Sequence, residues 1–312
     1  NSTYTDYFSH ITNLMKDKNR DEYHFFFLFL LKVSKHHKRT PDFFEKIEQI
    51  ILHFATEIKN NFTNLEIYNL FQSNLFKEGI LISNEKITIK ILQKTKEKRI
   101  KYHYYFYPEI KPFFDAEMRE KIENKLFKKD PIICEIFEEK RKIGENDSYI
   151  CELIRNDLVE DFIVYVNQTN ISLSSTIQSS LYETNSFLLK NKPTLIEYSA
   201  FFGSIQIFQY LRLKGVDLTP SLWLYVIHGR NPELIHLLEE NHIEPEDKTF
   251  LKCYEESIKC HHNDFAEYIY SNLLKAQVNE DDFINCYLLK YIFHYNNFAF
   301  LPKKLNNSFL FQ

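Results

Sequence analysis

The sequence predicts an all-α protein in which a helix–turn–helix solenoid follows an N-terminal helical region. One observation is a repeated motif: the segment around His261 returns around His294, 33 residues later. A fixed period of roughly 20 to 50 residues is typical of solenoids. The second observation is that apolar residues recur at helical spacing throughout the chain. We therefore divide the chain into an N-terminal helical region (1–145), a repeat array (150–300) and a polar tail (301–312).

The N-terminal region is predicted to be helical from its capping and apolar patterns. Thr40 can cap a helix that has Pro41 at its first position. The apolar positions that follow have helical spacing: Phe43, Phe44, Ile47, Ile50, Ile51, Phe54 and Ile58. Further helices are expected at residues 64–71 and 115–127, and a linker at 144–147.

The clearest repeat unit spans residues 194–217. Gly203 is placed to end a first helix in the left-handed conformation, and Ser204 to cap a second helix. The second helix has an apolar stripe that a neighbouring pair must cover, formed by Ile207, Phe208 and Leu211. A single unit would therefore not fold alone.

The same pattern returns further along the chain, with prolines at 193, 220 and 245 at the unit boundaries. Asn231 and Pro232 predict an N-cap and first position of a helix. Arg230 and His261 occupy the position of Gly203 in the following units, and His294 corresponds to His261 in the next repeat. A divergent first unit is expected at 154–163, followed by a long polar loop at 167–185.

Three segments of this array resemble ankyrin repeats, at residues 196–204, 227–241 and 257–264. More narrowly, they resemble a large group of ankyrin proteins of unknown function found in trichomonad protists. The usual Thr-Pro-Leu-His turn is replaced by Thr194-Leu195-Ile196-Glu197, which has neither the proline nor the histidine. The resemblance covers about half of the chain. It implies an ankyrin-like stacked-helix fold that binds protein on a concave face, and it brings no catalytic residues.

Composition narrows the possible functions and the compartment. A formal net charge of −4 does not favour a general nucleic-acid binder. The five cysteines are scattered, which indicates reduced thiols in an intracellular, most simply cytoplasmic, protein. The longest apolar run has seven residues (25–31), whereas a membrane span needs about 20. We expect neither a membrane span nor a signal peptide.

No enzymatic motif is present in the sequence. Its five glycines form neither a phosphate-binding loop nor a hydrolase nucleophile elbow. The best metal-like group is Cys253, Cys260, His261 and His262, but its spacing matches no standard zinc pattern. We therefore expect a structural role for these residues, with no metal, cofactor, small-molecule substrate or catalytic activity.

The sequence favours a protein-binding adaptor or scaffold with an unidentified protein partner. The candidate contacts lie at unit tips and first-helix surfaces: Glu197, Tyr198, Trp223, Tyr225, Tyr254 and Glu255. Alternatively, Trp223 and Tyr225 fill the core between units. A less favoured function is nucleic-acid or ribonucleoprotein binding by the basic and aromatic stretch 94–107. A solvated lysine face beside packed tyrosines explains that stretch more simply.

Overall fold

The computed structural model describes residues 2–16, 18–36, 41–62, 104–105, 107–127, 131–274 and 287–300. Within these ranges the secondary structure is helical, apart from one isolated antiparallel bridge between Thr176 and Thr194. The all-α prediction is confirmed. The described residues form two compact units. The first contains the chain up to Asn146, except His36, together with residues 180–186. The second contains His36 and the rest of the chain from Asp147 onward. None of the described helices is long and apolar enough to cross a membrane.

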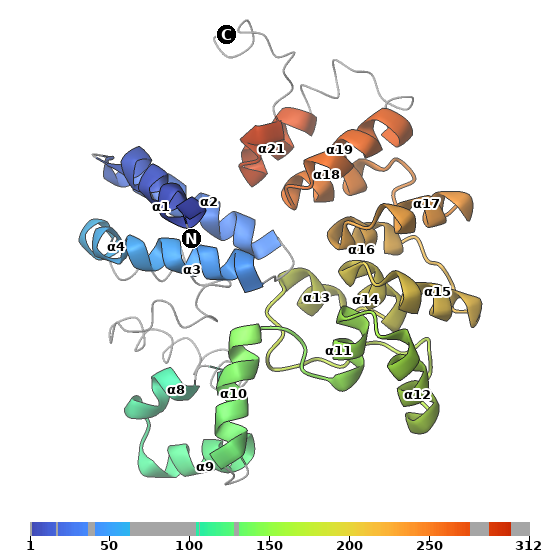
Figure 1. The fold of residues 1–312 in the computed structure, drawn as a ribbon, viewed down its shortest axis with the longest axis horizontal. Helices are drawn as coiled ribbons and strands as arrows, with labels where there is room; N and C mark the ends of the chain where they lie inside the picture. The colour runs from blue at the N-terminus through green and yellow to red at the C-terminus, as the bar shows by residue number, and fades with distance from the viewer. Residues whose placement is uncertain are drawn as a thin grey trace, which may run out of the picture. The chain divides into compact units, whose positions relative to one another are not determined.

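The first unit is built from helices around two clusters of apolar side chains. Its elements are α1 (Ser2–Met15), α2 (Arg20–His36), α3 (Pro41–His53), α4 (Ala55–Asn61), α8 (Tyr107–Ile110), the 3-10 helix η2 (Lys111–Phe113), α9 (Ala116–Leu126) and α10 (Pro131–Ile143) (Figure 1). Helix α3 begins at Pro41 as predicted, and the predicted stripe is buried from Ile47 to Ile58. The helix breaks at Phe54, between α3 and α4. The helix expected at 64–71 lies outside the described residues.

Helix α9 agrees closely with the prediction for residues 115–127. The Asp115 side chain accepts a hydrogen bond from the Met118 backbone N–H at 2.7 Å and so caps the helix. An N-cap of this kind satisfies one of the donors that a helix leaves free at its start.

The second unit consists of helix pairs stacked side by side (Figure 1). The pairs are α11 (Tyr149–Arg155) with α12 (Val159–Thr169), α14 (Leu195–Phe202) with α15 (Ile205–Leu213), α16 (Leu222–Gly229) with α17 (Pro232–Glu240), and α18 (Leu251–Lys259) with α19 (Asn263–Ile269). The π-helix η3 (Tyr270–Leu274) extends α19, and α21 (Leu289–Tyr295) precedes the 3-10 turn η5 (Phe298–Phe300). The first helices contact one another in the order α11, α14, α16, α18, α21. One hydrophobic core runs through all the pairs.

Each first helix is followed by a residue with positive φ. These residues are Asp157, Gly203, Arg230, His261 and Asn296. The predicted equivalence of Gly203, Arg230 and His261 is confirmed. The match of His294 to His261 is wrong, because His294 lies inside α21 and the left-handed residue there is Asn296.

The residue after the left-handed position joins successive pairs. Ser204 Oγ donates to the Ile154 carbonyl, His262 Nδ1 to the Ile227 carbonyl at 2.9 Å, and Asn297 Nδ2 to the Ile258 carbonyl at 2.8 Å. Asn231 Nδ2 donates instead to the carbonyl of Gly203, the left-handed residue itself, at 3.1 Å. We call these four bonds the inter-pair ladder. They give carbonyls near the ends of the first helices a partner in the next pair. The Ile154 and Ile258 carbonyls also accept the backbone N–H of the left-handed residue of their own pair.

The ladder explains why the predicted Ser204 cap is absent. The Ser204 side chain makes no capping bond to α15. Instead, the Asp157 carboxylate of the preceding pair accepts the Gln206 and Ile207 backbone N–H groups, each at 3.0 Å. The cap of α15 is therefore supplied across the pair boundary, where local sequence reasoning does not find it.

A closed loop stands between the first and second pairs. Its base is fixed by two backbone bonds, from Ile177 N to the Pro193 carbonyl at 2.7 Å and from Leu195 N to the Ser175 carbonyl at 3.1 Å. Within it lies the short helix α13 (Ser186–Asn191). The Phe187 ring of α13 packs against the rings of Tyr225 and His228, at centroid distances of 4.9 and 4.4 Å. Helix α13 therefore covers part of α16.

Candidate functional site

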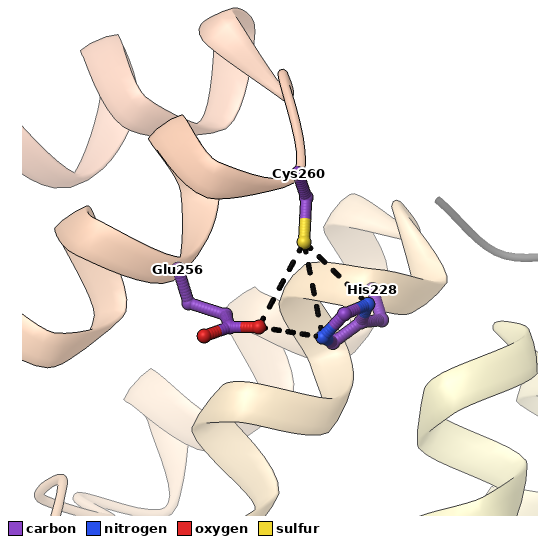
Figure 2. A group of neighbouring side chains, drawn as sticks. All are labelled: His228, Glu256 and Cys260. Carbon is purple, nitrogen blue, oxygen red and sulfur yellow. Dashed lines mark hydrogen bonds and ion pairs between the residues drawn. The ribbon is translucent and has the colours of Figure 1, made fainter. Parts of the chain in front are cut away.

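The most concentrated set of reactive side chains in the described chain is His228, Glu256 and Cys260, which we call the buried triad (Figure 2). His228 lies in the last turn of α16, whereas Glu256 and Cys260 are one helical turn apart at the end of α18. His228 Nε2 is 2.9 Å from Glu256 Oε1. Cys260 Sγ is 3.9 Å from the same oxygen. The triad thus connects two successive pairs.

Charge in the triad is concentrated on Glu256. Burial alone would raise the pKa of its carboxyl, but the His228 hydrogen bond and the charges of His228 and Lys259 outweigh burial and hold the pKa at about 2. Lys259 Nζ lies 2.8 and 2.9 Å from the two carboxylate oxygens. Burial, with the neighbouring Glu256 charge, raises the pKa of the Cys260 thiol well above its usual value. Glu256 is therefore ionised and Cys260 a neutral thiol at pH 7.

Imidazole, carboxylate and thiolate groups all bind zinc, so the triad is a candidate site for an ion. Cys260 Sγ lies 3.6 Å from His228 Nδ1 and 3.8 Å from Nε2, almost equally far from both. An ion on either nitrogen would lie in the ring plane, on the side away from the other nitrogen. A sulfur bound to that ion would be much closer to one nitrogen than to the other. The observed ring orientation therefore does not fit a metal held by all three residues.

The same geometry disfavours nucleophilic catalysis by Cys260. A reactive cysteine needs a lowered pKa and access to substrate, but this thiol is fully buried and its pKa is raised. The sulfur also lies off the lone-pair direction of both His228 nitrogens, so the imidazole is not placed to take its proton. The contacts of the triad instead favour a role in joining α16 to α18.

The predicted metal-like group is not brought together. Of its four residues, Cys260 alone belongs to the buried triad. His261 Nε2 donates to the Tyr295 carbonyl at 3.3 Å, and His262 is part of the inter-pair ladder. Cys253 is buried, and burial raises the pKa of its thiol. His228 was missed because its partners lie 28 and 32 residues away, beyond any local motif.

Four of the predicted protein-binding residues lie in the core. Tyr198, Trp223 and Tyr254 are each 1 % exposed and Tyr225 is 4 % exposed, so a partner cannot reach these rings without separating the pairs. Trp223 Nε1 donates to the Ile243 carbonyl at 2.6 Å, which satisfies its one polar group. The alternative that Trp223 and Tyr225 fill the core describes these two residues correctly. The assignment of Tyr198 and Tyr254 to a binding surface is corrected as well, because both rings are buried.

The two predicted acidic contacts are half-buried and already bonded. Glu197 forms a capping box with Thr194 at the start of α14 and also accepts a hydrogen bond from Ser221 Oγ at 2.6 Å. Glu255 accepts the Tyr295 hydroxyl at 2.7 Å. Both carboxylates therefore hold neighbouring elements together.

The basic and aromatic stretch 94–107 is described only in part. Tyr105 and Tyr107 are buried, and the Tyr107 hydroxyl donates to Glu123 at 2.7 Å. Buried rings cannot stack on bases. The lysines of this stretch lie outside the described residues.

Comparison with known proteins gives no further identification. No family model matches the chain, and no curated protein or solved structure matches it.

Proposed function

We propose that residues 150–300 form a divergent ankyrin-like array that acts as a non-enzymatic, cytoplasmic protein-binding adaptor. The observation that carries this proposal is the series of stacked helix pairs joined by the inter-pair ladder and one continuous core. Such an array is rigid enough to hold a series of exposed loops in fixed positions. Binding residues are commonly found on loops held by a rigid scaffold.

The proposed contact surface is the pair of loops at residues 214–221 and 241–250, which we call the inter-pair tips. They replace the buried aromatic residues as candidates. Exposed charged side chains on these tips are Lys214, Asp217, Glu244, Glu246 and Lys248. The first helix α16, which lies between the two tips in the chain, offers little surface, because all but one of its residues are buried.

The second tip is held in place by its own hydrogen bonds. Asp247 Oδ2 accepts the Lys252 backbone N–H at 3.0 Å and the Thr249 hydroxyl at 2.9 Å. The Trp223 bond to Ile243 fixes the start of the same loop. A loop ordered before binding loses less conformational entropy when it meets a partner, which favours affinity.

The proposal is tested by affinity capture from the source cell with two charge variants. One carries Glu244→Lys and Glu246→Lys on the second tip, and the matched control carries Glu135→Lys and Glu139→Lys on exposed positions of α10. Both variants change the charge equally and should keep the wild-type Tm. We expect a protein captured by the wild type and the control to be lost from the tip variant. Equal capture by all three forms, or no specific protein with the wild type, would reject the proposed surface.

A further inference from the structure

The last described pair exposes a position that every earlier pair buries. Three residues before the left-handed position stand Ile154, Ala200, Ile227 and Ile258, all at 0 % exposure. The equivalent residue of α21 is Phe293, which is 53 % exposed. Its ring packs edge-on against Phe298, with centroids 5.7 Å apart, and Phe298 is itself exposed. The position that contacts the next pair in the earlier units is therefore solvent-exposed in α21.

The first pair exposes the position on the other side of the same pair-to-pair contact. The position that carries a ladder donor in the other pairs is occupied by Leu158, which is 44 % exposed. Tyr149 of the same pair is 51 % exposed. A pair whose outer face meets no neighbour ordinarily carries polar residues on that face. The first pair and the last described pair instead expose apolar side chains.

The first pair and the last described pair carry opposite charges. The first pair has exposed carboxylates at Glu152, Glu160 and Asp161. Residues 287–300 have an exposed lysine, Lys290, and no acidic residue. Opposite charges on the two surfaces favour contact between them over contact of either surface with itself.

We infer that a second copy of this chain stacks head to tail on the first, with the α21 and η5 surface of one copy against the α11 and α12 surface of the next. The contact continues the pair-to-pair interface that already runs through the array. Its apolar centre is formed by Phe293 and Phe298 on one side and by Leu158 and Tyr149 on the other. Because the two surfaces differ, the contact is heterologous and can add further copies. This inference is independent of the proposed binding of another protein at the inter-pair tips.

Sedimentation of the full chain with two single variants tests the inference. Phe293→Glu blocks one surface, and Leu158→Asp blocks the other while placing a favourable N-cap residue at the start of α12. For the wild type at about 100 μM, which is about 100 times a Kd of 1 μM, we expect a weight-average mass above the 37.7 kDa of one chain. Each variant alone should stay at 37.7 kDa. An equimolar mixture should reach twice that mass and no more, because each variant retains the surface that the other lacks.

The matched control is Leu213→Asp, which adds a charge at a 78 % exposed leucine on the second pair. This variant should associate as the wild type does, and circular dichroism should show that all variants keep the wild-type helix content and Tm. A wild type that remains a monomer at this concentration would overturn the inference. So would association that survives both end variants, or a mixture of the two that stays monomeric.

Discussion

Replacing Gly229 by alanine separates the effect of helix propensity from that of packing between pairs. Gly229 is the last residue of α16, and in an unobstructed helix alanine would be more stable than glycine by about 1 kcal/mol. A Cβ at Gly229, however, would lie 2.2 Å from the Ala200 carbonyl oxygen, which belongs to the backbone of α14. It would also lie 3.0 Å from the Gly203 nitrogen. Since both neighbours are backbone atoms, α14 and α16 would have to move apart.

We expect Gly229→Ala to lower the free energy of unfolding by about 2 kcal/mol. Overpacking a well-packed site costs about 1–3 kcal/mol, and a clash with backbone atoms lies at or beyond the upper end of that range. The gain in helix propensity offsets about 1 kcal/mol of this cost. The assay is urea unfolding followed by circular dichroism. Gly215→Ala is the matched control: it has a positive φ but no atom within 4 Å of the added Cβ, so only the backbone cost of roughly 1–2 kcal/mol applies. A Gly229→Ala protein as stable as the wild type, or more stable, would refute the close approach of α14 and α16.

Three further outcomes follow from the packing and charges of the array. Phe208→Ala, at a fully buried position of the predicted stripe, should lower the free energy of unfolding by about 3–5 kcal/mol; a change below about 1 kcal/mol in urea unfolding would exclude a core position. Burial lowers the pKa of His261, so this histidine is protonated at a higher pH in the unfolded chain than in the folded chain. The free energy of unfolding should therefore fall as the pH drops below about 6.5. His261→Gln should lessen that fall in a series of Tm measurements, and a fall of unchanged size in this variant would contradict the reasoning. Finally, neither equimolar Zn²⁺ nor EDTA should shift the Tm, because the buried triad is not arranged around an ion; a rise with zinc that is abolished by His228→Gln would contradict that geometry.

The features that sequence predicted well depend on neighbouring residues. The Asn231 cap with Pro232, the left-handed Gly203 and the start of α3 each involve a few consecutive positions, and each is found in the structure. Local preference is enough there, because a helix end must satisfy its own backbone groups. The stripe on α15 was equally readable from its helical period.

The features that sequence missed depend on contacts between pairs. Ser204 has the side chain of an N-cap but bonds to Ile154, fifty residues earlier, and Asp157 takes the capping role. A tryptophan is common both in interfaces and in cores, so residue type does not place Trp223. Its location in the core follows from its hydrogen bond to the Ile243 carbonyl and from the packing around it. His294 was misaligned because its sequence resembles that around His261, whereas the structural equivalence follows the left-handed Asn296.

Hydrogen–deuterium exchange of the chain with and without its captured protein partner tests the central functional claim most directly. The account predicts that the partner slows exchange at the inter-pair tips, residues 214–221 and 241–250, and leaves α12 unchanged. Protection confined to α12 or to the first unit, with the tips exchanging as in the free chain, would contradict it.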